Sequence, residues 1–216
     1  MPAAPTLLLP LLTLAASLAL LACEPDPAPS PRFALRLDDP NPSAEADYPT
    51  VYEIDPLTPF FLDPRGASTG DPYALTCADD ELVVGLRGRS DGTIGALGLV
   101  CARMLDNGMF TSRDERPMIG AMTGETFSSD CPQNEAVMAV RGRAGTTLDR
   151  IGVRCARVRA WVQMGAPGSI EPSSGGTGGS PFTETCPPGY FLQGLLGYAT
   201  STAIHGVQGL CVPITT

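Results

Sequence analysis

The sequence contains no lysine, and it has only one histidine and one tryptophan among its 216 residues. All 14 basic residues are therefore arginines, and 23 acidic residues bring the net charge to −9. This balance argues against a nucleic-acid partner, because binding to phosphates needs a surplus of positive charge. The single histidine stands without a recognisable serine or cysteine nucleophile motif, so nothing supports a catalytic triad. We therefore expect a protein that is not an enzyme and does not bind nucleic acid.

Signals for metals are also missing. The seven cysteines include no short C-x-x-C pair of the kind that zinc sites use. The acidic stretch "ADDE" at 78–81 lacks the glycine-punctuated loop that is typical of calcium sites. We expect no metal and no cofactor.

The first 22 residues carry no charged side chain and have the composition of an apolar export segment. They end in "LLAC" (20–23), which resembles a bacterial lipobox. That resemblance implies a lipoprotein signal peptide over residues 1–22 and a lipid on Cys23. A simple transmembrane anchor and an ordinary signal peptide are the alternatives.

Residues 23–49 form a proline-rich segment, with seven prolines between positions 24 and 49. Such a segment buries little apolar area and favours extended, polyproline-like backbone. We interpret it as a tether between the lipid and a folded domain. We expect the protein at the bacterial outer membrane or the cell surface, where the lipid on Cys23 anchors it in the lipid bilayer.

The other six cysteines are regularly spaced. Within successive pairs the separations are 24, 24 and 25 residues, and between pairs they are 30 and 31. In the oxidising compartments that exported proteins reach, disulfides persist. The regularity favours one disulfide within each unit: Cys77–Cys101, Cys131–Cys155 and Cys186–Cys211.

The cysteine pairs mark a longer repeat of 54 to 55 residues. A glycine stands seven residues before each first cysteine and an aromatic residue four before it, as in "GDPYALTC" (70–77). Another glycine follows eleven residues after that cysteine: Gly88, Gly142 and Gly197. The predicted repeats span about 68–121, 122–175 and 176–216, and the third is completed by residues 50–67.

Each repeat has the pattern of β-strands. "ELVVGLRG" (81–88) alternates, so Leu82, Val84 and Leu86 are expected on one face. We expect a hairpin closed at its base by the disulfide, a strand at the aromatic segment and a further strand after the second cysteine, such as 156–164. Three repeats of four strands predict a closed all-β domain, which removes exposed sheet edges.

Two stretches of the chain resemble the jacalin-related lectins. "GGTGGSPF" (175–182) is similar to their glycine-rich segment before an aromatic residue, and "GTTLD" (145–149) to their G-x-x-x-D loop. The cysteine-bounded repeats also resemble the vitelline membrane outer layer protein I family. Both resemblances imply a β-prism over residues 50–216, with three four-stranded Greek-key sheets and pseudo-threefold symmetry.

The lectin resemblance implies a carbohydrate site. The Asp149 carboxylate would accept hydrogen bonds from sugar hydroxyls, and glycines would let the backbone approach closely. The candidate residues are Gly124, Gly145, Asp149, Gly176, Gly178, Gly179, Tyr198 and His205. Because the glycine-rich stretch precedes the third cysteine pair and Asp149 lies in repeat two, we expect them in different sheets. Alternatively, Asp149 is a turn residue bonded to backbone, Arg143 or Arg150.

The resulting functional hypothesis is a surface-tethered, carbohydrate-binding lipoprotein without enzymatic activity, whose partner is a carbohydrate or an envelope glycan. The alternative is a structural or protein-interaction module of the envelope with no sugar site.

Overall fold

The structure, a computed structural model, describes residues 50–216; the export segment, Cys23 and the tether lie outside this range. The described part folds into three antiparallel sheets and one short helix. The first sheet is built on a hairpin of β5 (Glu81–Ser90) and β6 (Ile94–Arg103). Strand β9 (Glu125–Asp130) pairs with β5, while β7 (Asp114–Glu115) and β8 (Ile119–Gly120) pair with β6.

The second sheet repeats this plan. Its hairpin consists of β10 (Ala136–Ala144) and β11 (Leu148–Ala156). Strand β13 (Ser180–Thr185) pairs with β10, and β12 (Ser174–Gly175) pairs with β11.

The third sheet joins the two ends of the described chain. Its hairpin consists of β14 (Tyr190–Ala199) and β15 (Ile204–Thr215). Four strands from the start of the described chain complete it: β4 pairs with β14, and β1, β2 and β3 pair with β15. These strands are β1 (Glu53–Ile54), β2 (Phe60–Phe61), β3 (Arg65–Gly66) and β4 (Asp71–Thr76).

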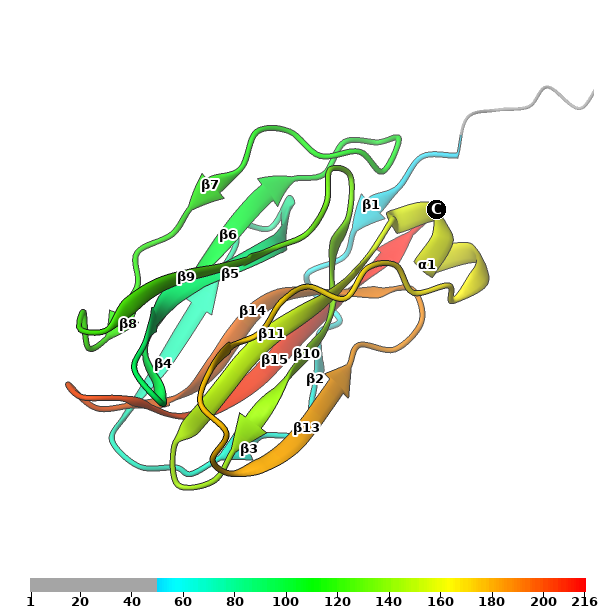
Figure 1. Cartoon of the computed structure of the whole chain (residues 1–216). Coiled ribbons are helices and arrows are strands. Elements are labelled where there is room, and N and C mark those ends of the chain that lie inside the picture. Colours follow the sequence, from blue (N-terminus) through cyan, green and yellow to red (C-terminus); the bar gives the residue numbers. More distant parts are fainter. Residues whose placement is uncertain (1–49) are drawn as a thin grey trace, which may run out of the picture. The chain divides into compact units, whose positions relative to one another are not determined.

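In the first and third sheets, two or three short strands pair one after another with the same hairpin strand, β6 or β15. When these short strands are counted together as one edge strand, each sheet has four strands. In the first sheet their order is β9, β5, β6 and then β7 with β8, which is the Greek-key order 4-1-2-3. Figure 1 shows the turns of the three hairpins at one end of the domain and the helix α1 at the other. The three sheets are thus three copies of one motif around a pseudo-threefold axis.

Strand exchange links the copies. The aromatic strand of each repeat pairs with the hairpin of the preceding repeat: Phe127 lies opposite Gly88, and Phe182 opposite Gly142. Tyr73, from the first repeat, lies opposite Gly197 of the third. A methyl group at Gly88 would lie 2.7 Å from the Phe127 ring, so the ring packs directly over the glycine. This contact explains why the aromatic and glycine positions recur together.

Because of this strand exchange, the disulfides connect different sheets. The structure contains Cys77–Cys101, Cys131–Cys155 and Cys186–Cys211, with Cα–Cα distances of 5.7, 5.7 and 5.9 Å. Cys131 directly follows β9 of the first sheet, whereas Cys155 lies on β11 of the second. The expectation of a disulfide at the base of one hairpin is therefore wrong: each bond joins neighbouring sheets.

A β-bulge alters the expected face pattern of each hairpin. In the first sheet the register shifts between Val83 and Gly85. Leu82 and Val84 consequently pack in a cluster with Trp161, while Val83 and Leu86 lie in the main core between the sheets. The prediction that Leu82, Val84 and Leu86 share one face is wrong, because the extra residue reverses the alternation.

The segment after the second cysteine of repeat two also differs from its prediction. Residues Val158–Met164 form the helix α1, where we expected a strand. Val158 and Trp161 are its buried residues, three positions apart on one helical face, and Trp161 Nε1 donates to the Tyr190 carbonyl at 2.8 Å. Across residues 50–216, no helix has the length and apolar character needed to cross a membrane.

Candidate functional site

The hairpin turns at one end of the domain each lie beside a glycine-rich loop. The three loops are "GASTG" (66–70), "GAMTG" (120–124) and "GGTGG" (175–179). The first and last glycine of every loop has a positive φ, between +58° and +112°. Glycine adopts this backbone conformation without the steric cost that other residues meet. The predicted completion of the third repeat by residues 50–67 reaches only Gly66 and Ala67 of this loop. The pairings of β3 with β15 and of β4 with β14 place the whole of "GASTG" beside the third sheet.

In the second sheet this loop meets the G-x-x-x-D turn. The loop 175–179 connects β12 to β13, and these strands pair with β11 and β10 on either side of the hairpin. The expectation that the two elements lie in different sheets is wrong. Strand exchange is the physical reason, because it carries the start of the third repeat onto the second sheet.

Asp149 lies at the centre of this junction. It is only 8% exposed, and Thr147 Oγ1 donates to its Oδ1 at 3.2 Å. A methyl group at Gly178 would lie 2.7 Å from Oδ1, and one at Gly179 would lie 2.5 Å from Oδ2. Glycine at both positions therefore lets the loop backbone reach the carboxylate. Within residues 50–216, Oδ2 accepts no hydrogen bond from the protein.

Gly145 and Gly176 belong to the same junction. The Gly145 N–H donates to the Thr147 carbonyl at 2.9 Å, which closes the hairpin turn. A methyl group at Gly145 would lie 3.4 Å from Gly179 Cα, so turn and loop touch. The Gly176 N–H donates to the Asp149 carbonyl at 2.7 Å. Five of the candidate residues are thus brought together.

Two arginines of the hairpin donate hydrogen bonds to the glycine-rich loop 175–179. Arg143 and Arg150 are register partners across the hairpin. Arg143 donates to the carbonyls of Gly178 and Gly179 at 2.7 and 2.6 Å. Arg150 donates to those of Gly176 and Gly175 at 2.9 and 3.2 Å. Neither arginine forms an ion pair with Asp149 in the described structure, so their interpretation as its partners is wrong.

His205 approaches the site from the third sheet. Its Nδ1 lies 2.9 Å from the Thr146 carbonyl, and its Nε2 lies 3.2 Å from Thr200 Oγ1. A carbonyl can only accept, so Nδ1 carries the proton of this hydrogen bond. His205 therefore bridges the second and third hairpin turns.

The other candidates lie elsewhere. Gly124 ends the loop of the first sheet, where a methyl group would lie 2.7 Å from the Ser90 carbonyl. Tyr198 lies on β14 and lines a separate cavity of the third sheet. The positions that correspond to Asp149 hold Gly95 in the first repeat and His205 in the third. A carboxylate in this position thus occurs in the second sheet alone.

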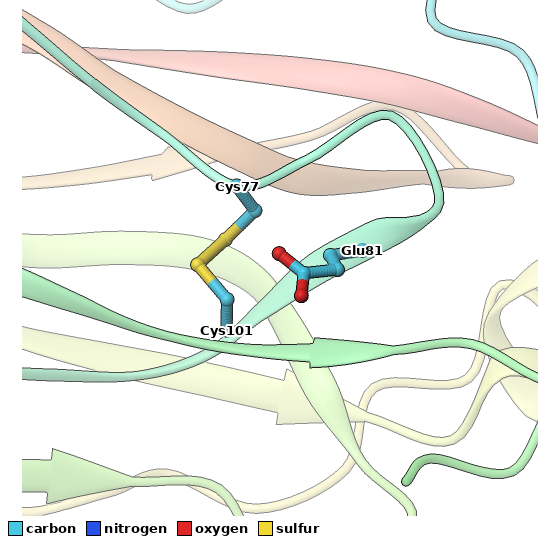
Figure 2. Close-up of side chains that lie close together, drawn as sticks. All are labelled: Cys77, Glu81 and Cys101. Atoms are coloured by element: carbon cyan, nitrogen blue, oxygen red, sulfur yellow. A yellow bond between two sulfur atoms is a disulfide. The ribbon is translucent and has the colours of Figure 1, made fainter. Parts of the chain in front are cut away.

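One further cluster brings together Cys77, Glu81 and Cys101, as Figure 2 shows. The two sulfurs form a disulfide and are therefore not thiolate ligands. The Glu81 carboxylate accepts from the Ala78 N–H at 3.0 Å and pairs with Arg116. These contacts give the group a structural role in the turn of the "ADDE" stretch.

The arrangement around Asp149 suits a ligand rich in hydroxyl groups. A carboxylate oxygen without a protein partner can accept hydrogen bonds from two adjacent hydroxyls. The glycines around it leave room for a ring to approach the backbone closely.

The sequence matches no family model, and no curated protein matches it. Several solved structures are similar in fold. Wild-type Malaysian banana lectin has a TM-score of 0.54 and 14% identity, over 72% of this chain and 99% of the lectin. A mannose-binding jacalin-related lectin from Ananas comosus has a TM-score of 0.50 and 14% identity, over 72% and 98% of the two chains. Calsepa lectin, solved in complex with a bisected glycan, has a TM-score of 0.50 and 13% identity, over 70% and 96%. This likeness confirms the predicted β-prism fold.

Proposed function

We propose that this protein is a carbohydrate-binding, lectin-like protein without enzymatic activity, and that its site is the junction of Asp149 with the glycine-rich loop 175–179. The observation that carries the proposal is the buried Asp149 carboxylate, whose Oδ2 has no partner within the described residues and lies beside Gly179. Two lectins of similar fold, one that binds mannose and one in complex with a bisected glycan, support a glycan as the ligand.

In this site the Asp149 carboxylate accepts hydrogen bonds from two sugar hydroxyls. The Arg143 hydrogen bonds to Gly178 and Gly179 keep the loop in place before the ligand arrives. A preformed loop loses little conformational entropy on binding, which favours affinity. His205 contributes by fixing the turn at Thr146.

A glycan array with the full chain tests the proposal. Asp149→Asn keeps the shape of the side chain but removes the charge and one acceptor oxygen. Each hydrogen bond to a charged group contributes about 1.5–3 kcal/mol, so we expect the affinity for the bound glycan to fall about 10- to 100-fold. Asp106→Asn is the control, because the Asp106 side chain is exposed and forms no hydrogen bond within the described structure.

If no glycan binds at high density, the lectin hypothesis is wrong. If Asp149→Asn instead unfolds the protein, Asp149 is a structural turn residue. Thermal melting of both variants separates loss of binding from loss of fold.

A second function is supported by four exposed apolar side chains in the segment 51–61, two of which lie on β2 at the outer edge of the third sheet. Val51, Leu57, Phe60 and Phe61 are 45%, 87%, 45% and 51% exposed. Exposed apolar side chains that gather on one surface are typical of protein-interaction sites. They favour an interaction module of the cell envelope. Replacing Leu57 and Phe61 with serine would then abolish co-purification of an envelope protein, whereas Asp149→Asn would leave it intact.

The location at the cell surface also belongs to the proposal. It rests on the apolar segment 1–22 and on "LLAC" at 20–23. Incorporation of radiolabelled palmitate tests it: a lipid on Cys23 predicts labelling of the full chain and none in Cys23→Ser. Labelling that persists in the variant contradicts the lipoprotein hypothesis.

A further inference from the structure

The outer faces of the three sheets differ in one respect. Two side chains flank the repeat glycine of each hairpin, and in the first and second sheets both are arginines: Arg87 with Arg89, and Arg141 with Arg143. Their guanidinium groups lie over the sheet and donate to carbonyls of the neighbouring segments. Arg89 reaches Gly124 at 3.0 Å, and Arg141 reaches the Glu171 carbonyl at 2.7 Å. The long side chains thus fill the space over both sheets.

The third sheet has no arginine at these two positions. Leu196 and Tyr198 take the two flanking positions, and Gly206 takes the position of Arg150. A cavity of about 210 Å³ occupies the space instead. It lies over β3, β15, β14 and β4, and its lining includes Gly66, Ala67, Tyr73, Tyr198 and Gln208.

The floor of this cavity is largely apolar. The Tyr73 ring is half-buried, and its hydroxyl donates to the Gly206 carbonyl at 3.0 Å. The repeat glycine Gly197 leaves the ring room, since a methyl group there would lie 2.8 Å from the Tyr73 hydroxyl. An aromatic wall over glycine backbone is suited to the flat, C–H-rich face of a small ring.

Polar groups without protein partners stand at the same cavity. Gln208 Nε2 donates to the Leu62 carbonyl at 2.8 Å, which leaves its amide oxygen available. Within residues 50–216, neither the Tyr198 hydroxyl nor the Ser68 hydroxyl forms a hydrogen bond. A ligand site typically combines an apolar body with a few such polar groups.

The cavity offers no free charge. Of its lining residues, Arg65 alone is charged. Its Nε donates to Glu184 Oε1 at 2.7 Å, and its guanidinium forms an ion pair with the same carboxylate. An anionic ligand would have to compete with Glu184, so an uncharged ligand fits best. Because the volume lies below the range of about 300–1,000 Å³ that is typical of ligand pockets, the occupant is a single ring.

From these observations we propose that the outer face of the third sheet holds a second binding site, distinct from the Asp149 site, for one uncharged, hydroxyl-bearing ring. The ring stacks on Tyr73 and Tyr198, and its hydroxyl groups bond to Gln208 and Ser68. Two sources share this chemistry, a pyranose unit and a phenol. This proposal goes beyond the lectin function and does not depend on it.

The test uses the full chain with Asp149→Asn, which weakens the proposed glycan site about 10- to 100-fold, and the cavity variants described below separate any remaining binding there from binding in the cavity. Methyl α-glucopyranoside and 4-methylphenol are titrated separately at millimolar concentration, and binding is measured by saturation-transfer NMR. We expect at least one probe to bind, and the one that binds identifies the source. If neither probe binds, the proposal is wrong.

Tyr198→Arg then copies the second sheet and fills the cavity, and we expect it to weaken binding about tenfold or more. Ser68→Trp obstructs the cavity from an exposed position and should act in the same way without touching the core. Arg89→Tyr, on the first sheet, is the matched control and should leave the affinity unchanged. Binding that withstands both Tyr198→Arg and Ser68→Trp overturns the assignment.

Discussion

The close packing of Gly179 against Asp149 predicts a large loss of stability for Gly179→Ala. Its φ is +58°, and a methyl group there would lie 2.5 Å from Asp149 Oδ2 and 2.6 Å from the Ala144 carbonyl oxygen. Gly179→Ala therefore adds backbone strain and a clash with rigid backbone. A left-handed conformation of a non-glycine residue costs about 1–2 kcal/mol. With the displacement of Ala144 and Asp149, we expect a loss of about 3–5 kcal/mol in the free energy of unfolding.

Gly189→Ala is the matched control. Its φ is +85°, but nothing lies within 4 Å of the added methyl group. The loss in the free energy of unfolding of Gly189→Ala therefore measures the backbone strain alone, about 1–2 kcal/mol. For a domain of this size each kcal/mol lowers the melting temperature by about 2–4 °C. We expect losses of about 2–8 °C for Gly189→Ala and about 6–20 °C for Gly179→Ala, measured by calorimetry with disulfides intact.

The two glycine variants are also expected to differ in glycan binding. Gly179→Ala forces the loop away from the carboxylate and should abolish glycan binding, whereas Gly189→Ala should preserve it. If the two variants have equal melting temperatures and equal affinities, the loop does not approach Asp149 closely, and the loop 175–179 is not part of a glycan site.

Three further predictions follow from the same structure. Replacing Cys131 and Cys155 together by alanine removes a link between two sheets and should cost about 3–4 kcal/mol, measured by denaturant unfolding; a loss below about 1 kcal/mol would contradict this role. Burial raises the pKa of the Tyr73 phenol above its ordinary value of 10.0, so the protonated form stabilises the fold fully below pH 10, and that stability is lost as the pH rises further. Tyr73→Phe should flatten the fall in melting temperature above pH 10, and an unchanged pH profile would refute the effect. Arg143→Met removes the hydrogen bonds to Gly178 and Gly179 and should weaken glycan binding several-fold while thermal melting shows a folded protein; unchanged affinity would show that the loop holds its shape without the arginine.

The prediction of a strand after Cys155 shows where local pattern fails. "ARVRAWVQM" (156–164) alternates as a strand does, yet Val158–Met164 is a helix. Its place at the end of the domain allows Val158 and Trp161 to cover the cluster that contains Leu82 and Phe191. Which surface needs covering is a property of the assembled sheets, and no window of the sequence contains it.

The candidate site was partly predictable. Gly145, Asp149 and the glycine-rich stretch stand out because their spacing resembles the lectin loops. The contributions of Arg143, Arg150 and Thr147 were not predictable, since an arginine on a strand has the same appearance whether it points to solvent or to a loop carbonyl. The only sequence signal was the recurrence of arginines beside Gly88 and Gly142.

The sequence by itself determined the three repeats, the all-β class and the position of the hairpins, because cysteine spacing and strand alternation are written along the chain. Only the tertiary structure decided which strand pairs with which hairpin. Pairing depends on contacts between residues about 40 positions apart, such as Phe127 with Gly88. That exchange moves the glycine-rich loop onto the sheet of Asp149 and so assembles the site.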